Sequence, residues 1–262
     1  ATVDLGAGET TGEVADDPDA DTTLVERCLD LTTARYGDGE AGHVRTESEV
    51  PTAAGLKSSS AAANATVLAT LDALGVPVAD DPGRPSDEGE VTRVEACRLG
   101  VAAARDAGVT VTGAFDDASA SMLGGVTVTD NDADDLLAHE AVGWDALVWT
   151  PPERSFSAAA DVERCARVAP MARLVADLAL DGRYGAAMTV NGLAYSAALE
   201  FPTEPAVEAM PHAAGVSLSG TGPSVVAVGD REELAQVREH WDQRTGDTWM
   251  TTTRTDGARV IE

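Results

Sequence analysis

The excess of acidic residues is the feature that most limits what this chain can form. The sequence contains 45 acidic and 18 basic residues, which gives a formal net charge of -27 at pH 7. Self-repulsion of this size opposes a compact state at low salt. Molar salt shortens the Debye length to about 3 Å and removes most of that penalty. The chain is therefore either a disordered acidic segment or a folded protein adapted to a salty cytoplasm.

The hydrophobic content favours the folded protein. Hydrophobic residues make up 44% of the chain and recur with clear periodicity, which a disordered acidic segment does not show. Aromatic residues make up only 4%, so the core must consist largely of Ala, Val and Leu. The negative charge argues against nucleic acid and against an anionic membrane as partners. We expect a cytoplasmic location, and the sequence makes no prediction of the oligomeric state.

Apolar spacing, together with glycine and proline positions, predicts the secondary structure. In the first half we expect helices over 21–36, 61–74 and 91–107, strands over 43–50 and 126–129, a surface loop over 79–90, and irregular structure over 113–121. Residues 130–135 are expected to link the two halves. In the second half we expect strands over 146–149, 215–218, 224–228 and 248–253, and helices over 161–181 (divided at Pro170), 183–199, 204–211 and 231–244. The second half is typical of an α+β sandwich with an antiparallel sheet.

The segment from Pro51 to Ala61 reads PTAAGLKSSSA and lies between a predicted strand and a predicted Ala-rich helix. A helix N-terminus offers unpaired N–H groups and a partial positive charge, and it binds phosphate without needing many cations. The three consecutive serines can instead cap the helix, as serines often do. They stand beside Lys57, the only lysine in the chain, which favours a phosphate site. The Walker A pattern occurs nowhere in the sequence, so a nucleotide would need a different loop.

A second segment, GAFDDASAS over 113–121, places two adjacent carboxylates after a glycine. An aspartate near a substrate hydroxyl can accept its proton as the hydroxyl attacks phosphorus. The alternative is that an aspartate only caps a short helix. A third segment, SLSGTGPS over 217–224, places glycines between two predicted strands and allows backbone to approach a ligand closely.

Taken in order, these segments resemble the GHMP kinase superfamily, and more specifically its archaeal shikimate kinase family of the haloarchaeal type. The resemblance rests on the blocks GLKSSSAAANATVLATLDALG, TVTGAFDDASASMLGGVTVTDN, NGLAYSAALEFPTEPA and LSGTGPS, and it extends from about residue 20 to the C-terminus. The four blocks together are specific, whereas each glycine motif alone is not.

The resemblance implies an α+β fold of two domains. Residues 1–135 would form a ribosomal protein S5 domain 2-like N-terminal domain that binds ATP, and residues 136–262 a ferredoxin-like C-terminal domain. Asp116 would be the catalytic base, and Ser59 would approach Mg²⁺ with Asp106 as a second magnesium ligand and Glu95 as its substitute. The residues expected to bind ATP are Pro51, Ala54, Gly55, Leu56, Lys57, Ser58, Ser59, Ser60, Ala61, Gly220, Thr221 and Gly222.

The activity that the resemblance implies is transfer of the ATP γ-phosphoryl group to the 3-hydroxyl of shikimate, in chorismate and aromatic amino-acid biosynthesis. Two alternatives stay open: another GHMP kinase acting on homoserine or mevalonate, and a ligand sensor on the same fold without catalysis. The family pattern includes an earlier segment, near SGT-x-x-NA-x-ATG, that does not occur in this sequence. We therefore expect an N-terminal truncation before Ala1.

Overall fold

The computed structural model describes residues 1–15, 17–51, 53–79, 89–110, 113–155 and 160–261. The chain divides into two compact units. The first unit contains residues 1–50, 57–139 and 255–262, and the second contains residues 51–56 and 140–254. The two-domain division at residue 135 stays a prediction. None of the described helices is long and apolar enough to cross a membrane.

A small mixed sheet forms one side of the first unit. Its strand order is β1-β3-β2, with β1 (Thr2–Gly6) antiparallel and β2 (Thr11–Val14) parallel to the central β3 (Ala41–Thr46). The strand expected over 43–50 is confirmed as β3, although it begins and ends earlier. The first two strands were not predicted from the sequence.

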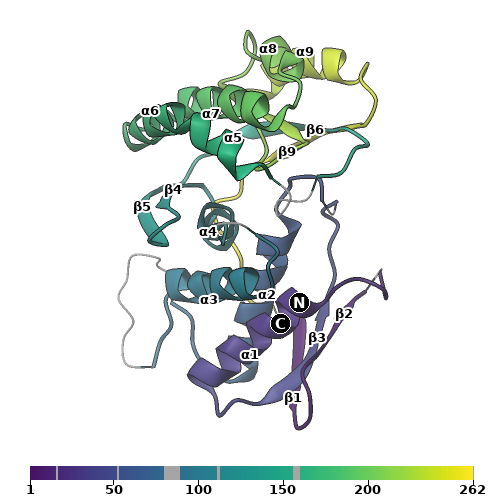
Figure 1. Ribbon diagram of the computed structural model, residues 1–262, viewed down its shortest axis with the longest axis vertical. Helices are drawn as coiled ribbons and strands as arrows, with labels where there is room; N and C mark the ends of the chain where they lie inside the picture. The colour runs from purple at the N-terminus through teal and green to yellow at the C-terminus, as the bar shows by residue number, and fades with distance from the viewer. Residues whose placement is uncertain (16, 52, 80–88, 111–112, 156–159, 262) are drawn as a thin grey trace. The chain divides into compact units, whose positions relative to one another are not determined.

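The described part of this unit also contains four helices: α1 (Thr23–Tyr36), α2 (Ser58–Ala73), α3 (Arg93–Asp106) and α4 (Phe115–Leu123). In Figure 1, α1 lies along the small sheet. Helices α2 and α3 pack against α1 and each other, and α4 packs against α2 and α3. The first three helices confirm the sequence prediction, with α2 starting three residues earlier than expected, at Ser58. The prediction of irregular structure over 113–121 is wrong, because α4 occupies most of that range. Most of the surface loop expected over 79–90 lies outside the described residues.

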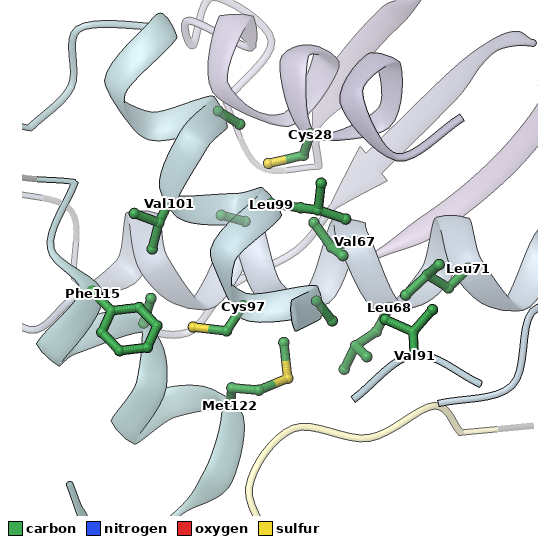
Figure 2. Close-up of a cluster of buried hydrophobic side chains, with 14 of the residues drawn as sticks. Cys28, Val67, Leu68, Leu71, Val91, Cys97, Leu99, Val101, Phe115 and Met122 are labelled. Carbon is green, nitrogen blue, oxygen red and sulfur yellow. The ribbon is translucent and has the colours of Figure 1, made fainter. Parts of the chain in front are cut away.

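The core of the first unit lies where its helices meet. Figure 2 shows side chains from α1, α2, α3 and α4 converging there, including Val67, Leu71, Phe115 and Met122. Cys28 and Cys97 belong to this cluster, and burial raises the pKa of each thiol to about 12. Both cysteines therefore act as small apolar side chains at neutral pH.

Residues 130–135 do not link the two halves as expected. They connect β4 (Val126–Asp130) to β5 (Asp135–Glu140), and these two strands pair with each other. The C-terminal segment also belongs to the first unit. Arg93 on α3 donates hydrogen bonds to the carbonyls of Met122, at the end of α4, and of Ala258, at 3.3 and 2.9 Å.

The second unit is built on an antiparallel sheet with the order β7-β8-β6-β9. Its strands are β6 (Asp145–Thr150), β7 (Gly215–Leu218), β8 (Val225–Gly229) and β9 (Asp247–Thr252), and its helices are α5 (Val162–Arg167), α6 (Ala169–Leu180), α7 (Tyr184–Leu199), α8 (Glu204–Ala209) and α9 (Arg231–Trp241). All of these elements confirm the sequence prediction within a few residues. The break between α5 and α6 falls at Val168, just before Pro170.

Helix α7 packs unusually close to β7 because two of its positions are glycine. A Cβ atom at Gly192 would lie 2.5 Å from the Cα of Ser217, and one at Gly185 would overlap the carbonyl of Ala214. A side chain at either position would force the helix away from the sheet. These two glycines, seven residues apart, lie on the same face of the helix.

We predict that Gly192→Ala destabilises the protein by about 1 to 3 kcal/mol, because the added methyl group has no space in a packed interface. Ala197→Ser, on the exposed side of the same helix, is the matched control and should change stability by less than about 0.5 kcal/mol. Denaturant unfolding in molar KCl measures both values. Equal stability of the two variants would show that α7 can retreat from the sheet at no cost.

Candidate active site

The start of α2 has the properties of an anion site. Lys57 is the N-cap residue, and Ser58, Ser59 and Ser60 form the first turn. The side chain of Lys57 makes no capping hydrogen bond to this end of the helix. The first turn contains no acidic residue, although the chain has 45 of them. The alternative that the serines cap the helix does not hold for the N-cap position, since Lys57 occupies it and the serines follow in the first turn. The N–H groups and the positive end of the helix dipole can therefore attract an anion.

Two of the predicted motifs meet within the second unit. The hydroxyl of Ser224 donates to the carbonyl of Ala54 at 2.6 Å, and the hydroxyl of Ser219 donates to the carbonyl of Gly55 at 2.7 Å. Gly55 has a φ of 76°, and a Cβ atom there would lie 2.5 Å from the carbonyl oxygens of both Ser219 and Gly222. Only glycine satisfies both requirements at this position.

The glycine loop itself is tightly folded. Gly220 and Gly222 have φ values of 56° and 78°, and the ring of Phe201 covers Gly222. Thr221 lines a pocket together with Arg164 and Phe201. The guanidinium of Arg164 is already bound to the carbonyl of Ala198, near the end of α7, at 2.6 Å. Gly220 to Gly222 thus lie beside Ala54 and Gly55, and all of these residues belong to the set predicted to bind ATP.

The side chain of Lys57 binds Asp117 on α4. Its Nζ atom lies 2.7 Å from Oδ1 and 2.8 Å from Oδ2 of that carboxylate. The two side chains are only 28% and 20% exposed, so the pair is largely shielded from solvent. Lys57 itself has a φ of 67°, in the left-handed region that favours glycine. A non-glycine residue in this conformation costs about 1 kcal/mol or more.

Burial raises the pKa of Asp117 to about 6, against the nearby Lys57 ammonium, which lowers it. The negative charge of the adjacent Asp116 raises it further. A carboxyl group with a pKa near neutrality is suited to exchange a proton with a substrate at physiological pH. The sequence points to both aspartates of this segment, but nothing in it indicates which of them faces the lysine.

Asp116 faces a different partner, Asn131 in the β4–β5 turn. The amide Nδ2 of Asn131 donates to Oδ1 of Asp116 at 2.7 Å, and the backbone N–H of Asp116 donates to Oδ1 of Asn131 at 3.1 Å. Asp116 is exposed, whereas Asp117 is shielded. The two adjacent carboxylates therefore lie in different environments.

The predicted magnesium ligands Ser59 and Asp106, and Glu95 as the substitute for Asp106, have different surroundings. Ser59 is exposed in the first turn of α2, where its hydroxyl can reach an ion held by phosphate oxygens. Asp106 is bound by Arg27 of α1 at 2.7 Å, and Glu95 closes the capping box of α3 with Thr92. No group of three or more His, Cys, Asp or Glu residues in the described ranges could hold a metal ion. The donor set thus fits Mg²⁺ held mainly by phosphate and water, with Ser59 as a protein ligand.

The chain belongs to the GHMP kinase family. Residues 23–125 match the model of the GHMP kinases N terminal domain, and residues 180–248 match that of the GHMP kinases C terminal domain. A protein named shikimate kinase from Halobacterium salinarum is 67% identical over 249 residues, covering 95% of this chain and 84% of the relative. Another, from Methanococcoides burtonii, is 46% identical over 232 residues, covering 88% and 76%.

Solved structures of other GHMP kinases share the fold. The homoserine kinase from Cytophaga hutchinsonii matches with a TM-score of 0.68 at 16% identity, covering 97% of this chain and 84% of that one. The Methanococcus jannaschii mevalonate kinase matches with a TM-score of 0.68 at 13% identity, covering 97% and 87%. These similarities confirm the predicted two-domain GHMP kinase fold.

We predict that Lys57→Gly changes stability in a pH-dependent way. Glycine relieves the left-handed strain, but the substitution leaves Asp117 buried without its cation and raises its pKa further above 6. Since ionised Asp117 is then more costly to bury, the variant should lose about 1 to 2 kcal/mol relative to the parent protein at pH 8. Below the pKa of Asp117, where the carboxyl is protonated in both proteins, the difference should vanish or reverse.

Unfolding in molar KCl at pH 5 and pH 8 measures this effect. In an Asp117→Asn background the same Lys57→Gly substitution should show no such pH dependence. A stability difference that is equal at the two pH values would mean that the Lys57–Asp117 pair does not shift the titration of this carboxyl.

Proposed function

We propose that this chain is a shikimate kinase, which transfers the γ-phosphoryl group of ATP to the 3-hydroxyl of shikimate. The observation that supports this most strongly is the 67% identity, over 95% of the chain, to a relative of that name. A second support is the start of α2, which is free of acidic residues and stands next to the only lysine of the chain. Both features suit a triphosphate.

In the proposed reaction the shikimate oxygen forms a bond to the γ-phosphorus as the bond to the ADP oxygen breaks. The hydroxyl proton passes to a carboxylate, and ADP leaves with the bonding electron pair. In such reactions the protein mainly positions the groups and neutralises charge. The ammonium of Lys57 and the N–H groups of Ser58 to Ser60 would face the phosphate oxygens. The wider predicted set, which is Pro51, the residues from Ala54 to Ala61, and Gly220, Thr221 and Gly222, would bind the rest of the nucleotide.

Magnesium would be held by the phosphate oxygens and by the hydroxyl of Ser59, and it would neutralise charge on the triphosphate. Asp106 stays a prediction as its second ligand. To serve in that role, its carboxylate would have to leave Arg27, to which it is bound at 2.7 Å with 47% of its side chain exposed.

Two adjacent carboxylates are candidates for the base. The assignment to Asp116 stays a prediction from the family resemblance. The geometry favours Asp117, because it lies against Lys57 and because burial raises its pKa to about 6. A base of that pKa is ionised at neutral pH and still able to accept a proton from the attacking hydroxyl.

We expect ADP release in molar KCl with shikimate, and none above background with homoserine or mevalonate. The three alcohols are assayed in parallel, with the ATPase rate in their absence as the baseline. Turnover with homoserine or mevalonate instead would assign the chain to another kinase of the family. No turnover with any of them, from protein shown to be folded, would contradict the kinase proposal and favour a sensor that binds ligands without catalysis.

We expect Asp117→Asn to lower kcat by about two or more orders of magnitude, because the amide cannot accept the proton. The Kd for ATP should change by less than about threefold, since the phosphate-binding backbone is untouched. In the parent enzyme kcat/KM should fall about tenfold per pH unit below the pKa of Asp117, which is near 6. Near-normal turnover of Asp117→Asn would show that Asp117 is not the base and would leave Asp116 as the candidate.

A further inference from the structure

Helix α4 begins without a cap of its own. Its N-cap residue is Ala114, whose φ is 52° and whose side chain has no hydrogen-bonding atom. Uncapped N–H groups at a helix start are costly when no water or side chain satisfies them. The side-chain oxygen of Asn131, fifteen residues further along the chain, accepts the N–H of Asp116 in the first turn of α4. This is the bond that an N-cap side chain normally accepts.

The same asparagine also holds the carboxylate of Asp116. Its Nδ2 group donates to Oδ1 of Asp116 at 2.7 Å, so two reciprocal hydrogen bonds join the pair. This pattern determines the amide orientation, because a backbone N–H needs the oxygen and a carboxylate needs the NH₂ group. The hydroxyl of Thr129 adds a third bond, to Oδ1 of Asn131, at 2.9 Å.

The direction of Asp117 follows from that of Asp116. Successive residues of a helix are rotated by about 100°, so one of two neighbours cannot turn without the other. With Asp116 bound to Asn131 on one side, Asp117 points to Lys57 on another. The reciprocal bonds therefore set the angle at which Asp117 meets the start of α2.

The turn that presents Asn131 is itself fixed. The carboxylate of Asp130 accepts the N–H of Asp132 at 3.0 Å. Arg105 on α3 binds both oxygens of Asp134, each at 2.7 Å. Arg98, seven residues earlier on the same helix, donates to the carbonyl of Asp134 at 2.9 Å. A turn held from α3 in this way can act as a rigid support for α4.

From these contacts we propose that Asn131 is a positioning residue for the phosphoryl transfer. It caps α4 from the β4–β5 turn, binds Asp116, and thereby directs Asp117 toward Lys57 and the phosphate-binding start of α2. Asp116 is then part of the support, and Asp117 is the group that meets the substrate. This inference rests on the proposed kinase function and specifies how its acidic pair is held.

An exchange of the two side chains tests the proposal. Asn131→Asp places two carboxylates at the 2.7 Å contact, so it should displace the start of α4. We expect kcat with shikimate to fall by about 10- to 100-fold, with the KM for ATP changed by less than about threefold. Asp116→Asn keeps an acceptor for Asn131 and should cost less than about tenfold. The double variant Asp116→Asn/Asn131→Asp restores the amide–carboxylate pair and should recover most of the loss.

The matched control is Asp132→Asn, which changes one charge in the same turn at an exposed side chain and should retain parental kcat. The proposal would be overturned if Asp116→Asn were itself severely impaired and the double variant were no more active. That result would make Asp116 the base. Parental activity of Asn131→Asp would overturn it as well.

Hydrogen exchange separates this inference from the proposed activity. The amides of Phe115 to Ala118 should exchange faster in Asn131→Asp than in the parent protein, and the double variant should restore their protection. This readout needs no substrate, so it holds even if shikimate is not the acceptor. Unchanged exchange in Asn131→Asp would show that Asn131 does not hold the start of α4, whatever the acceptor is.

Discussion

The ion pair between Lys57 and Asp117 is the contact on which the candidate site depends. It joins the start of α2, where an anion can bind, to the start of α4, where the carboxylates lie, with Nζ at 2.7 Å from Oδ1. Lys57 holds a left-handed backbone that glycine would adopt at no cost. Lys57 is also the only lysine in the chain, so its ammonium group is the cation that we assign to this site.

Other side-chain contacts within the first unit hold α4 in the position where Asp117 meets Lys57. Asn64 of α2 donates to the carbonyl of Ala118 at 2.8 Å, and Asn131 caps the first turn. At the other end, Arg93 binds the carbonyl of Met122 and that of Ala258 in the C-terminal segment. A cation at a helix C-terminus also interacts favourably with the helix dipole. The short helix is thus fixed at its start, its middle and its end by side chains from other elements.

The sequence predicted those elements in which apolar residues recur with the period of a helix or a strand. The long helices α1, α2, α3 and α7 and the apolar strands β6 and β8 repeat apolar residues clearly enough to be recognised. Helix α4 was missed because it is short, is rich in small residues, and takes its cap from Asn131. The sequence indicates a candidate phosphate loop with its lysine, but the choice between Asp116 and Asp117 depends on which partner each side chain faces. Only the tertiary contacts with Asn131 and Lys57 determine that.

The most direct test of this account is the titration of the Asp117 carboxyl carbon by ¹³C NMR in molar KCl. We predict one aspartate signal with a midpoint near pH 6, absent in Asp117→Asn and shifted to higher pH in Lys57→Gly. A midpoint near the ordinary value of about 4, unmoved by Lys57→Gly, would contradict the buried pair and the base role that we derive from it.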